Sequence, residues 1–188
     1  MKIRIERNSI GTLYDVDQQN IVVSFNYPVT FTEDGHQPAL VKVGQRQPFT
    51  ELLAKVMPAA DEIATALLKK PRNLQRIGFV ANVRIPPDSL PPGVELFLKH
   101  LGRPWGGMPT AAVTRISAKL GGRDQCHHQV QWQADSDVMI LALDWQRYFD
   151  PAREVDAKGL AKLAAEASVA ALTYFEKFGE GDLDYAAE

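Results

Sequence analysis

The sequence predicts an α+β fold in which an antiparallel β-sheet is packed on one face by a long C-terminal helix and a kinked central helix. Three observations lead to this prediction. Residues 138–143 form an almost unbroken apolar run, which Asp144 and Trp145 close. An amphipathic pattern then extends from about Asp156 to Phe178. The strands that precede it are joined by tight turns, which connect antiparallel neighbours.

The apolar run has the features of a central strand. It is too short for a membrane span, which needs ~20 apolar residues, and it lies between Asp135–Asp137 and a turn that contains Pro151. Both faces of the strand are largely apolar, so both need a cover, and we expect the terminal helix to cover the first of them. By alternation, the first face consists of Val138, Ile140, Ala142 and Asp144. The second face consists of Met139, Leu141, Leu143 and Trp145.

The terminal helix is predicted from one buried stripe whose members recur at spacings of three and four. Asp156 is expected to cap its first turn, and Gly179 to end it. About 22 residues would give a rod of roughly 33 Å, long enough to cross a small sheet. Residues 179–188 are expected to form a flexible tail. The stripe consists of Leu160, Leu163, Ala167, Ala171, Tyr174 and Phe178.

The other elements follow from alternation, turns and prolines. We expect a helix over Phe49–Lys70, which Pro58 kinks or divides because proline lacks an N–H and clashes one turn back. A short helix is expected at about Val94–Leu101. The expected strands are Lys2–Arg7, Ile21–Val29, Leu74–Pro86, and a hairpin of Ala112–Leu120 and Cys126–Ala134 around the turn at Gly121–Asp124.

Length and composition predict a single domain over residues 1–188 and exclude few classes of protein. The chain is 45% hydrophobic and 23% charged, which is ordinary for a globular protein, and its formal net charge is −2. Bulk charge therefore does not favour nucleic acid as a partner. The N-terminus lacks the layout of a signal peptide, and one cysteine permits no internal disulfide. These features predict a cytoplasmic protein with no membrane association.

Three segments resemble a sporadically distributed family of uncharacterised bacterial proteins. Residues 76–86 match an R-hydrophobic-G-x-x-x-N strand, and residues 140–145 match an L-x-L-D-hydrophobic strand. Residues 171–176 match a closing helix that carries a Phe-Glu pair. Ala81 and Gln146 stand where that family often has an aromatic residue and a second acid. The resemblance covers about residues 74–178 and implies a shared fold, with no activity to carry over.

A polar cluster on the sheet is the first candidate site. Its members each lie on a predicted strand and interrupt or face apolar residues. On neighbouring strands they would bring an Asp–Arg pair and an amide together, which can orient a polar or anionic ligand. The alternative is an ordinary cross-strand pair with a structural role. The candidates are Asn82, Arg84, Arg115 and Asp144.

A metal site is the second candidate, and we expect none. Cys126 and His128 share one face of a predicted strand, whereas His127 points to the other. Two ligands leave a zinc or copper site incomplete, so a buried cysteine and a partly buried histidine are the alternative. We find no Gly-x-Ser-x-Gly motif and no phosphate-binding glycine loop. The sequence therefore predicts no catalytic residue and no cofactor.

A protein interface is the third candidate, because the terminal helix can cover only one face of the central strand. The second face would then bind a protein partner or a second copy of the chain, unless the central helix or loops with Trp105 and Tyr14 cover it. The function predicted is a non-catalytic interaction module, of the antitoxin, immunity or assembly-subunit kind. The alternative is a small-molecule binder or hydrolase with a cavity between the sheet and the long helix. The candidate interface residues are Trp145, Leu143, Trp132 and Trp105.

Overall fold

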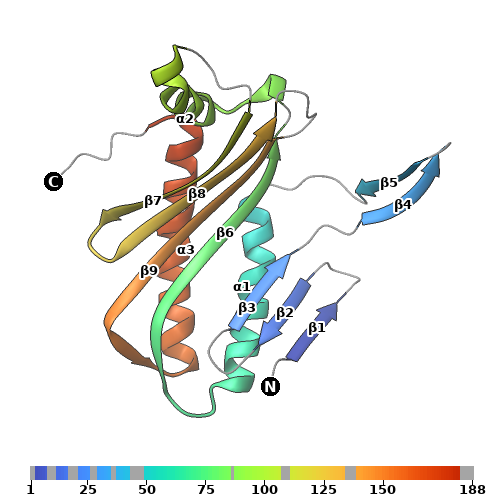
Figure 1. Cartoon of the computed structure of the whole chain (residues 1–188). Helices are drawn as coiled ribbons and strands as arrows, with labels where there is room; N and C mark the ends of the chain where they lie inside the picture. The colour runs from blue at the N-terminus through green and yellow to red at the C-terminus, as the bar shows by residue number, and fades with distance from the viewer. Residues whose placement is uncertain are drawn as a thin grey trace. The chain divides into compact units, whose positions relative to one another are not determined.

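The computed structural model describes residues 3–7, 12–16, 21–25, 29–34, 37–42, 49–85, 87–106, 111–133 and 139–182 (Figure 1). The chain forms two compact units. One unit comprises Met1–Pro71 with Asp156–Ala161, and the other comprises Arg72–Val155 with Lys162–Glu188. The single domain expected over residues 1–188 stays a prediction.

The first unit contains two small antiparallel sheets. The first of these has the order β1-β2-β3, and the second is a pair formed by β4 and β5. The sequence predicts one strand over Ile21–Val29, but β3 ends at Phe25 and β4 begins at Val29. Residues 26–28, which include Pro28, lie outside the described residues. The strands are β1 (Ile3–Arg7), β2 (Thr12–Val16), β3 (Ile21–Phe25), β4 (Val29–Asp34) and β5 (Gln37–Lys42).

The central helix of the sequence prediction is α1 (Phe49–Leu67), which contacts β3 in the first unit. It includes Pro58 within one continuous element, so the proline does not divide it. Its buried apolar side chains are Leu53, Ala59 and Ala64.

The second unit is built on a four-stranded antiparallel sheet with the order β6-β9-β8-β7. The strand predicted to be central lies in β9, which pairs with β6 on one side and β8 on the other. Leu141 lies opposite Val83 of β6 and Val130 of β8. The sheet therefore confirms the antiparallel part of the predicted fold class. Its strands are β6 (Arg72–Ile85), β7 (Ala111–Gly121), β8 (Asp124–Gln133) and β9 (Met139–Val155).

Strand β9 continues ten residues beyond Trp145, where the sequence predicts a polar connection. The ladder between β6 and β9 shifts register between Leu74 and Arg76. Tyr148 pairs with Arg76 and Arg153 pairs with Leu74, so Pro151 falls in the irregular stretch between them. A proline is tolerated there because it interrupts no regular ladder bond.

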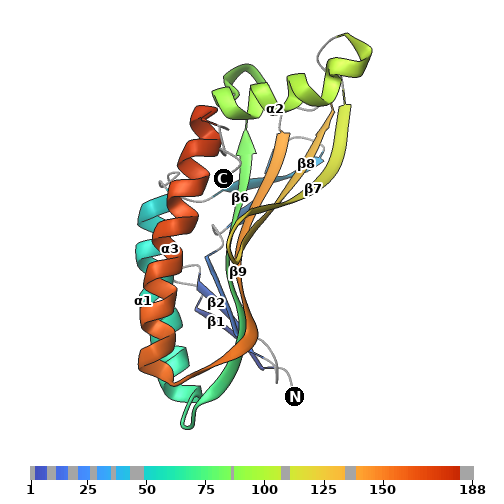
Figure 2. The same ribbon diagram turned by 90° about the vertical axis from the view of Figure 1, so that its left-hand side faces the viewer.

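Helix α3 (Ala157–Glu180) packs on one face of this sheet, as Figure 2 shows. The indole of Trp145 forms a buried cluster with Ala167, Ala171 and Tyr174 of α3, and the small alanines let the helix approach the strands. Five of the six predicted stripe residues are buried, from Leu163 to Phe178, which confirms the stripe over most of its length.

The helix covers the opposite face of β9 from the one expected. Met139, Leu141, Leu143 and Trp145 share one face and expose 0 to 6% of their surface, and Trp145 of this face packs against α3, whereas Ile140 is 40% exposed. These four side chains bury more apolar area than Ile140 and Ala142 would. The other choice would also bury the carboxylate of Asp144, which is costly without a compensating partner. We call the α3-covered side the inner face and the side of Ile140, Ala142 and Asp144 the outer face.

The two ends of α3 are capped by local hydrogen bonds. The Asp156 carboxylate accepts from the Gly159 N–H at 2.7 Å, which confirms the predicted N-cap. The C-terminal residue in the left-handed region is Gly181 (φ 82°) and not the predicted Gly179, which is helical. The N–H groups of Gly181 and Asp182 donate to the carbonyls of Phe178 and Lys177, which is the Schellman pattern. Residues 179–182 thus belong to the helix and its cap and not to the predicted tail, and residues 183–188 lie outside the described residues.

Helix α2 (Pro92–Gly102) meets the C-terminal end of α3 within the second unit. Gly93 packs so closely against the Phe178 carbonyl that a Cβ at this position would lie 1.5 Å from its oxygen. Val94 and Leu98 are buried, and the rings of Phe97 and Phe178 meet edge to face with centroids 6.2 Å apart. The predicted short helix is confirmed, with its start two residues earlier.

Within the described part of the chain, no helix is long and apolar enough to cross a membrane. The cytoplasmic location stays a prediction.

Candidate functional site

A hydrogen-bonded row of polar side chains runs along β9 on the outer face. Gln146 is at its centre, since its Nε2 donates to both oxygens of Asp144 at 3.0 and 2.9 Å. The Gln146 Oε1 accepts from the Tyr148 hydroxyl at 2.8 Å and from Arg76 Nη1 of β6 at 3.1 Å. The amide therefore joins a carboxylate, a phenol and a guanidinium, and these contacts orient all four side chains relative to one another.

The four residues predicted as a polar cluster occupy positions on this same face. Asn82 pairs with Ala142, and Arg115 pairs with Gln129, which in turn pairs with Ala142. Asp144 is two residues from Ala142 and shares its face. Arg84 lies opposite Ile140 by register, and its side chain lies outside the described residues.

The described hydrogen bonds of Asp144 go to Gln146, and both Asn82 and Arg115 are exposed. The structure thus brings the four positions onto one face without an Asp144–Arg115 ion pair. Ligand binding by this set stays a prediction. The Gln146–Tyr148–Arg76 contacts were missed, although the i, i+2 spacing of Asp144, Gln146 and Tyr148 would have predicted a shared face had the strand been extended past Trp145.

An ion pair ties the β7–β8 hairpin to β9 on the inner face. Arg147 donates two hydrogen bonds to the two oxygens of Asp124, from Nε at 2.7 Å and from Nη2 at 2.8 Å. The hydrogen bond to Asp124 raises the pKa of Arg147, burial opposes the shift, and the charges of Asp124 and Glu166 add to it. The guanidinium also lies 5.1 Å from the centroid of the Trp145 ring, a cation–π contact. These contacts hold Arg147 in a fixed position and leave it no role that needs proton loss.

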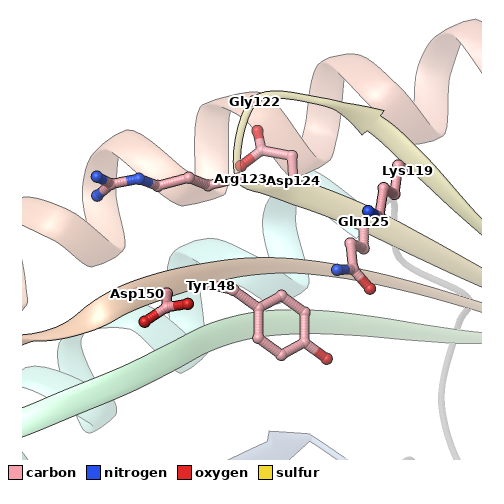
Figure 3. A pocket seen from close by; sticks show the side chains of 7 residues that line it. All are labelled: Lys119, Gly122, Arg123, Asp124, Gln125, Tyr148 and Asp150. Carbon is pink, nitrogen blue, oxygen red and sulfur yellow. The ribbon is translucent and has the colours of Figure 1, made fainter.

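A hollow of about 190 Å³ lies beside this ion pair, where the hairpin turn meets β9 (Figure 3). The side chains of Lys119 and Arg123 lie at opposite ends of the group in Figure 3, so the two cations do not converge on one point. The hollow also contains two carboxylates, of which Asp124 is paired with Arg147. This arrangement does not form an anion-binding site. The lining residues are Lys119, Gly122, Arg123, Asp124, Gln125, Tyr148 and Asp150.

The predicted interface on the second face of the central strand is wrong for two of its residues. Trp145 is 1% exposed and Leu143 is 6% exposed, because α3 covers the inner face on which they lie. Neither side chain is available to a partner. The side chains of Trp132 and Trp105 lie outside the described residues, so their predicted role stays a prediction.

The structure gives only the backbone register of the possible metal ligands. Cys126 pairs with Trp145 and His128 pairs with Leu143, and the side chains of Cys126 and His128 lie outside the described residues. Among the side chains that the structure describes, no three His, Cys, Asp or Glu residues are grouped as metal ligands would be. The absence of a metal site stays a prediction.

Comparison of the chain with protein-family models, with curated proteins and with solved structures found no match. The resemblance of residues 74–178 to a sporadically distributed bacterial family stays a prediction.

Proposed function

We propose that this protein is a non-catalytic interaction module that binds another protein chain through the outer face of the β6-β9-β8-β7 sheet. The observation that carries the proposal is the exposure of apolar side chains among ordered polar ones on this face. Val113 is 78% exposed, Val80 is 53% exposed and Ile140 is 40% exposed. The face therefore presents exposed apolar side chains together with hydrogen-bonding groups.

The composition of the outer face supports a protein partner. Interfaces between separately folded proteins are about as apolar as the rest of the surface, with polar groups around apolar contacts. Val113 and Ile140 lie in one row of the sheet, since both pair with Gln131. They are two strands apart, roughly 10 Å, so one partner element can contact both.

The hydrogen bonds among the polar groups of the outer face support a non-catalytic role. A general base must reach a substrate proton, whereas both oxygens of Asp144 accept from the Gln146 amide. The Tyr148 hydroxyl donates to the same amide. These contacts hold the groups as an ordered polar surface, which suits recognition of a partner.

The alternative is a small-molecule binder or hydrolase with a cavity between the sheet and α3. Its support is weaker, because Trp145 packs against Ala167 and Ala171 with 1% or less of each residue exposed. The hollow beside Tyr148 lies at the hairpin turn and not beneath the helix. A ligand would have to displace well-packed side chains at this part of the core.

A paired charge insertion tests the proposal. Val113→Glu combined with Ile140→Glu places two carboxylates on the outer face, and Val169→Glu on α3, which is 64% exposed, is the matched control. Affinity purification from native cells with cross-linking mass spectrometry should give a stoichiometric partner cross-linked to the outer face. The double variant should lose it at least tenfold, and Val169→Glu should retain it.

Light scattering after size-exclusion chromatography identifies a second copy as the partner if the wild type is a dimer that the double variant dissociates. A wild-type monomer that yields no cross-linked partner contradicts the proposal. Equal loss of the partner in Val169→Glu and in the double variant contradicts it as well, since the effect would then be independent of the face.

A further inference from the structure

We propose that the partner presents an extended acidic segment, which adds to the sheet as an antiparallel strand beside β7. This inference rests on the proposed function and specifies the partner's chemistry. Strand β7 has 11 residues and pairs with β8. Among the described strands it stands at the end of the order β6-β9-β8-β7, so its other side has no strand partner there. A strand edge of this kind presents backbone N–H and C=O groups that can pair with another chain.

Two cations define the chemistry of this edge. Arg115 and Lys119 are exposed and lie four residues apart on the outer face, roughly 13 Å along the strand. Within the described part of the chain, neither side chain forms an ion pair. Val113, two residues before Arg115, exposes 78% of its surface on the same face. Alternate residues of β7 on the outer face are therefore apolar, cationic, polar and cationic, namely Val113, Arg115, Ser117 and Lys119.

The hairpin as a whole is positive in a chain that is net negative. Residues 111–133 contain three cations, Arg115, Lys119 and Arg123, against one carboxylate, Asp124. That carboxylate is already paired with Arg147 of β9. An acidic segment that approaches β7 would therefore meet a cationic strand edge, even though the chain as a whole has a formal net charge of −2. Charge complementarity of this kind sets specificity and the rate of association.

A second copy of β7 fits this edge less well. Antiparallel pairing of two β7 strands about Ser117 would place Arg115 of each copy opposite Lys119 of the other. Like charges directly opposite across strands destabilise the pair, and lysine on an edge is a common protection against self-pairing. The same cations that oppose a second copy would attract a strand with carboxylates at the matching positions.

The register of β7 defines the sequence of a suitable partner. In an antiparallel strand, a residue opposite Lys119 comes first, and a residue opposite Arg115 comes four positions later. A residue opposite Val113 follows two positions after that. We therefore expect acidic residues four apart, with an apolar residue two positions beyond the second.

The test uses a labelled threonine-rich peptide with two glutamates four residues apart and a valine two residues after the second. Its control has the same composition with the glutamates three residues apart, which places them on opposite faces of a strand. Fluorescence anisotropy at low salt should show at least tenfold tighter binding of the first peptide. Protection of the β7 amides from hydrogen exchange should accompany binding.

Variants of the chain then locate the effect. Arg115→Glu and Lys119→Glu should each weaken binding at least fivefold, and together they should favour a peptide with lysines in place of the glutamates. Lys162→Glu, at an exposed position on α3, should leave binding unchanged. Equal binding of the two glutamate spacings, or of an oligothymidylate at the same concentration, would overturn the inference because charge alone would then explain it.

The outcomes separate this inference from the proposed function. If the peptide fails to bind while Val113→Glu with Ile140→Glu still removes a protein partner, the outer face binds a partner of another shape and the inference is wrong. If the peptide binds with the expected spacing while no native partner is found, the edge chemistry stands and the proposed function fails.

Discussion

Replacing Gly93 with alanine tests the contact between α2 and α3 with a single methyl group. The added Cβ would lie 1.5 Å from the Phe178 carbonyl oxygen and 2.7 Å from its carbon. Since non-bonded atoms approach to about 3.5 Å, the two backbones must separate by roughly 2 Å. That movement would loosen Val94 and Leu98, which expose 1% and 0% of their surface. Overpacking of this kind costs about 1–3 kcal/mol, and a contact with rigid backbone falls at the upper end.

Gly179 provides a control that differs only in its surroundings. A Cβ added there meets nothing within 4 Å, and the residue is helical. Alanine at this position should leave stability unchanged or raise it by up to about 1 kcal/mol, because glycine is the poorer helix former. The two substitutions are chemically identical and should act with opposite sign.

Urea unfolding followed by circular dichroism measures both effects. Linear extrapolation gives the free energy of unfolding if the transition has a single step, and the midpoint gives the order of stability otherwise. Gly93→Ala should lower the midpoint clearly below that of the wild type and of Gly179→Ala. A value for Gly93→Ala within about 0.5 kcal/mol of the wild type would refute the close approach of the two helices.

Two further predictions concern the sheet. Leu141→Ala should cost about 2–5 kcal/mol because the side chain is 3% exposed, whereas Ile140→Ala, on the outer face at 40% exposure, should cost under about 1 kcal/mol. Equal costs in urea unfolding would contradict the assignment of the inner face. Asp124→Asn and Arg147→Met should show a coupling of about 1 kcal/mol in a double-mutant cycle, since both partners are about a quarter exposed and their contact is bidentate. Additive effects would mean that the pair contributes nothing beyond its separate packing.

The elements with one strong periodic signal could be predicted from the sequence. The α3 stripe was found because Leu163, Ala167 and Ala171 recur at helical spacing, and tertiary packing uses that same stripe. The β7–β8 hairpin was found because glycines at the turn lie between two alternating segments. In both cases the local pattern and the tertiary structure agree, so no competing interaction overrides the local preference.

The choice of covered face could not be read from hydrophobicity, because both faces of β9 are apolar around Ile140 and Leu141. The deciding residue was Asp144, whose ionised carboxylate is cheaper to leave beside water than to bury under a helix. The cost of burying the Asp144 carboxylate predicts that the helix covers the opposite face of β9. That face includes Trp145, which would then lie in the core and not at an interface. The end of β9 was missed for another reason, since Pro151 reads as a turn unless the shifted ladder around Leu74 is known.

The Asp124–Arg147 pair was beyond sequence reasoning because its partners are 23 residues apart and meet only through the register of β8 on β9. This pair also determines the charge that a partner meets at the hairpin. Asp124 is held by Arg147, and Asp144 is held by Gln146 two strands from β7. Among the described residues, neither Arg115 nor Lys119 forms an ion pair with a carboxylate. Two strands are roughly 10 Å apart, about one Debye length at 0.1 M salt. At this salt concentration screening weakens the field of Asp144 at β7, and the two edge cations lie nearer than Asp144 to a strand that pairs with β7.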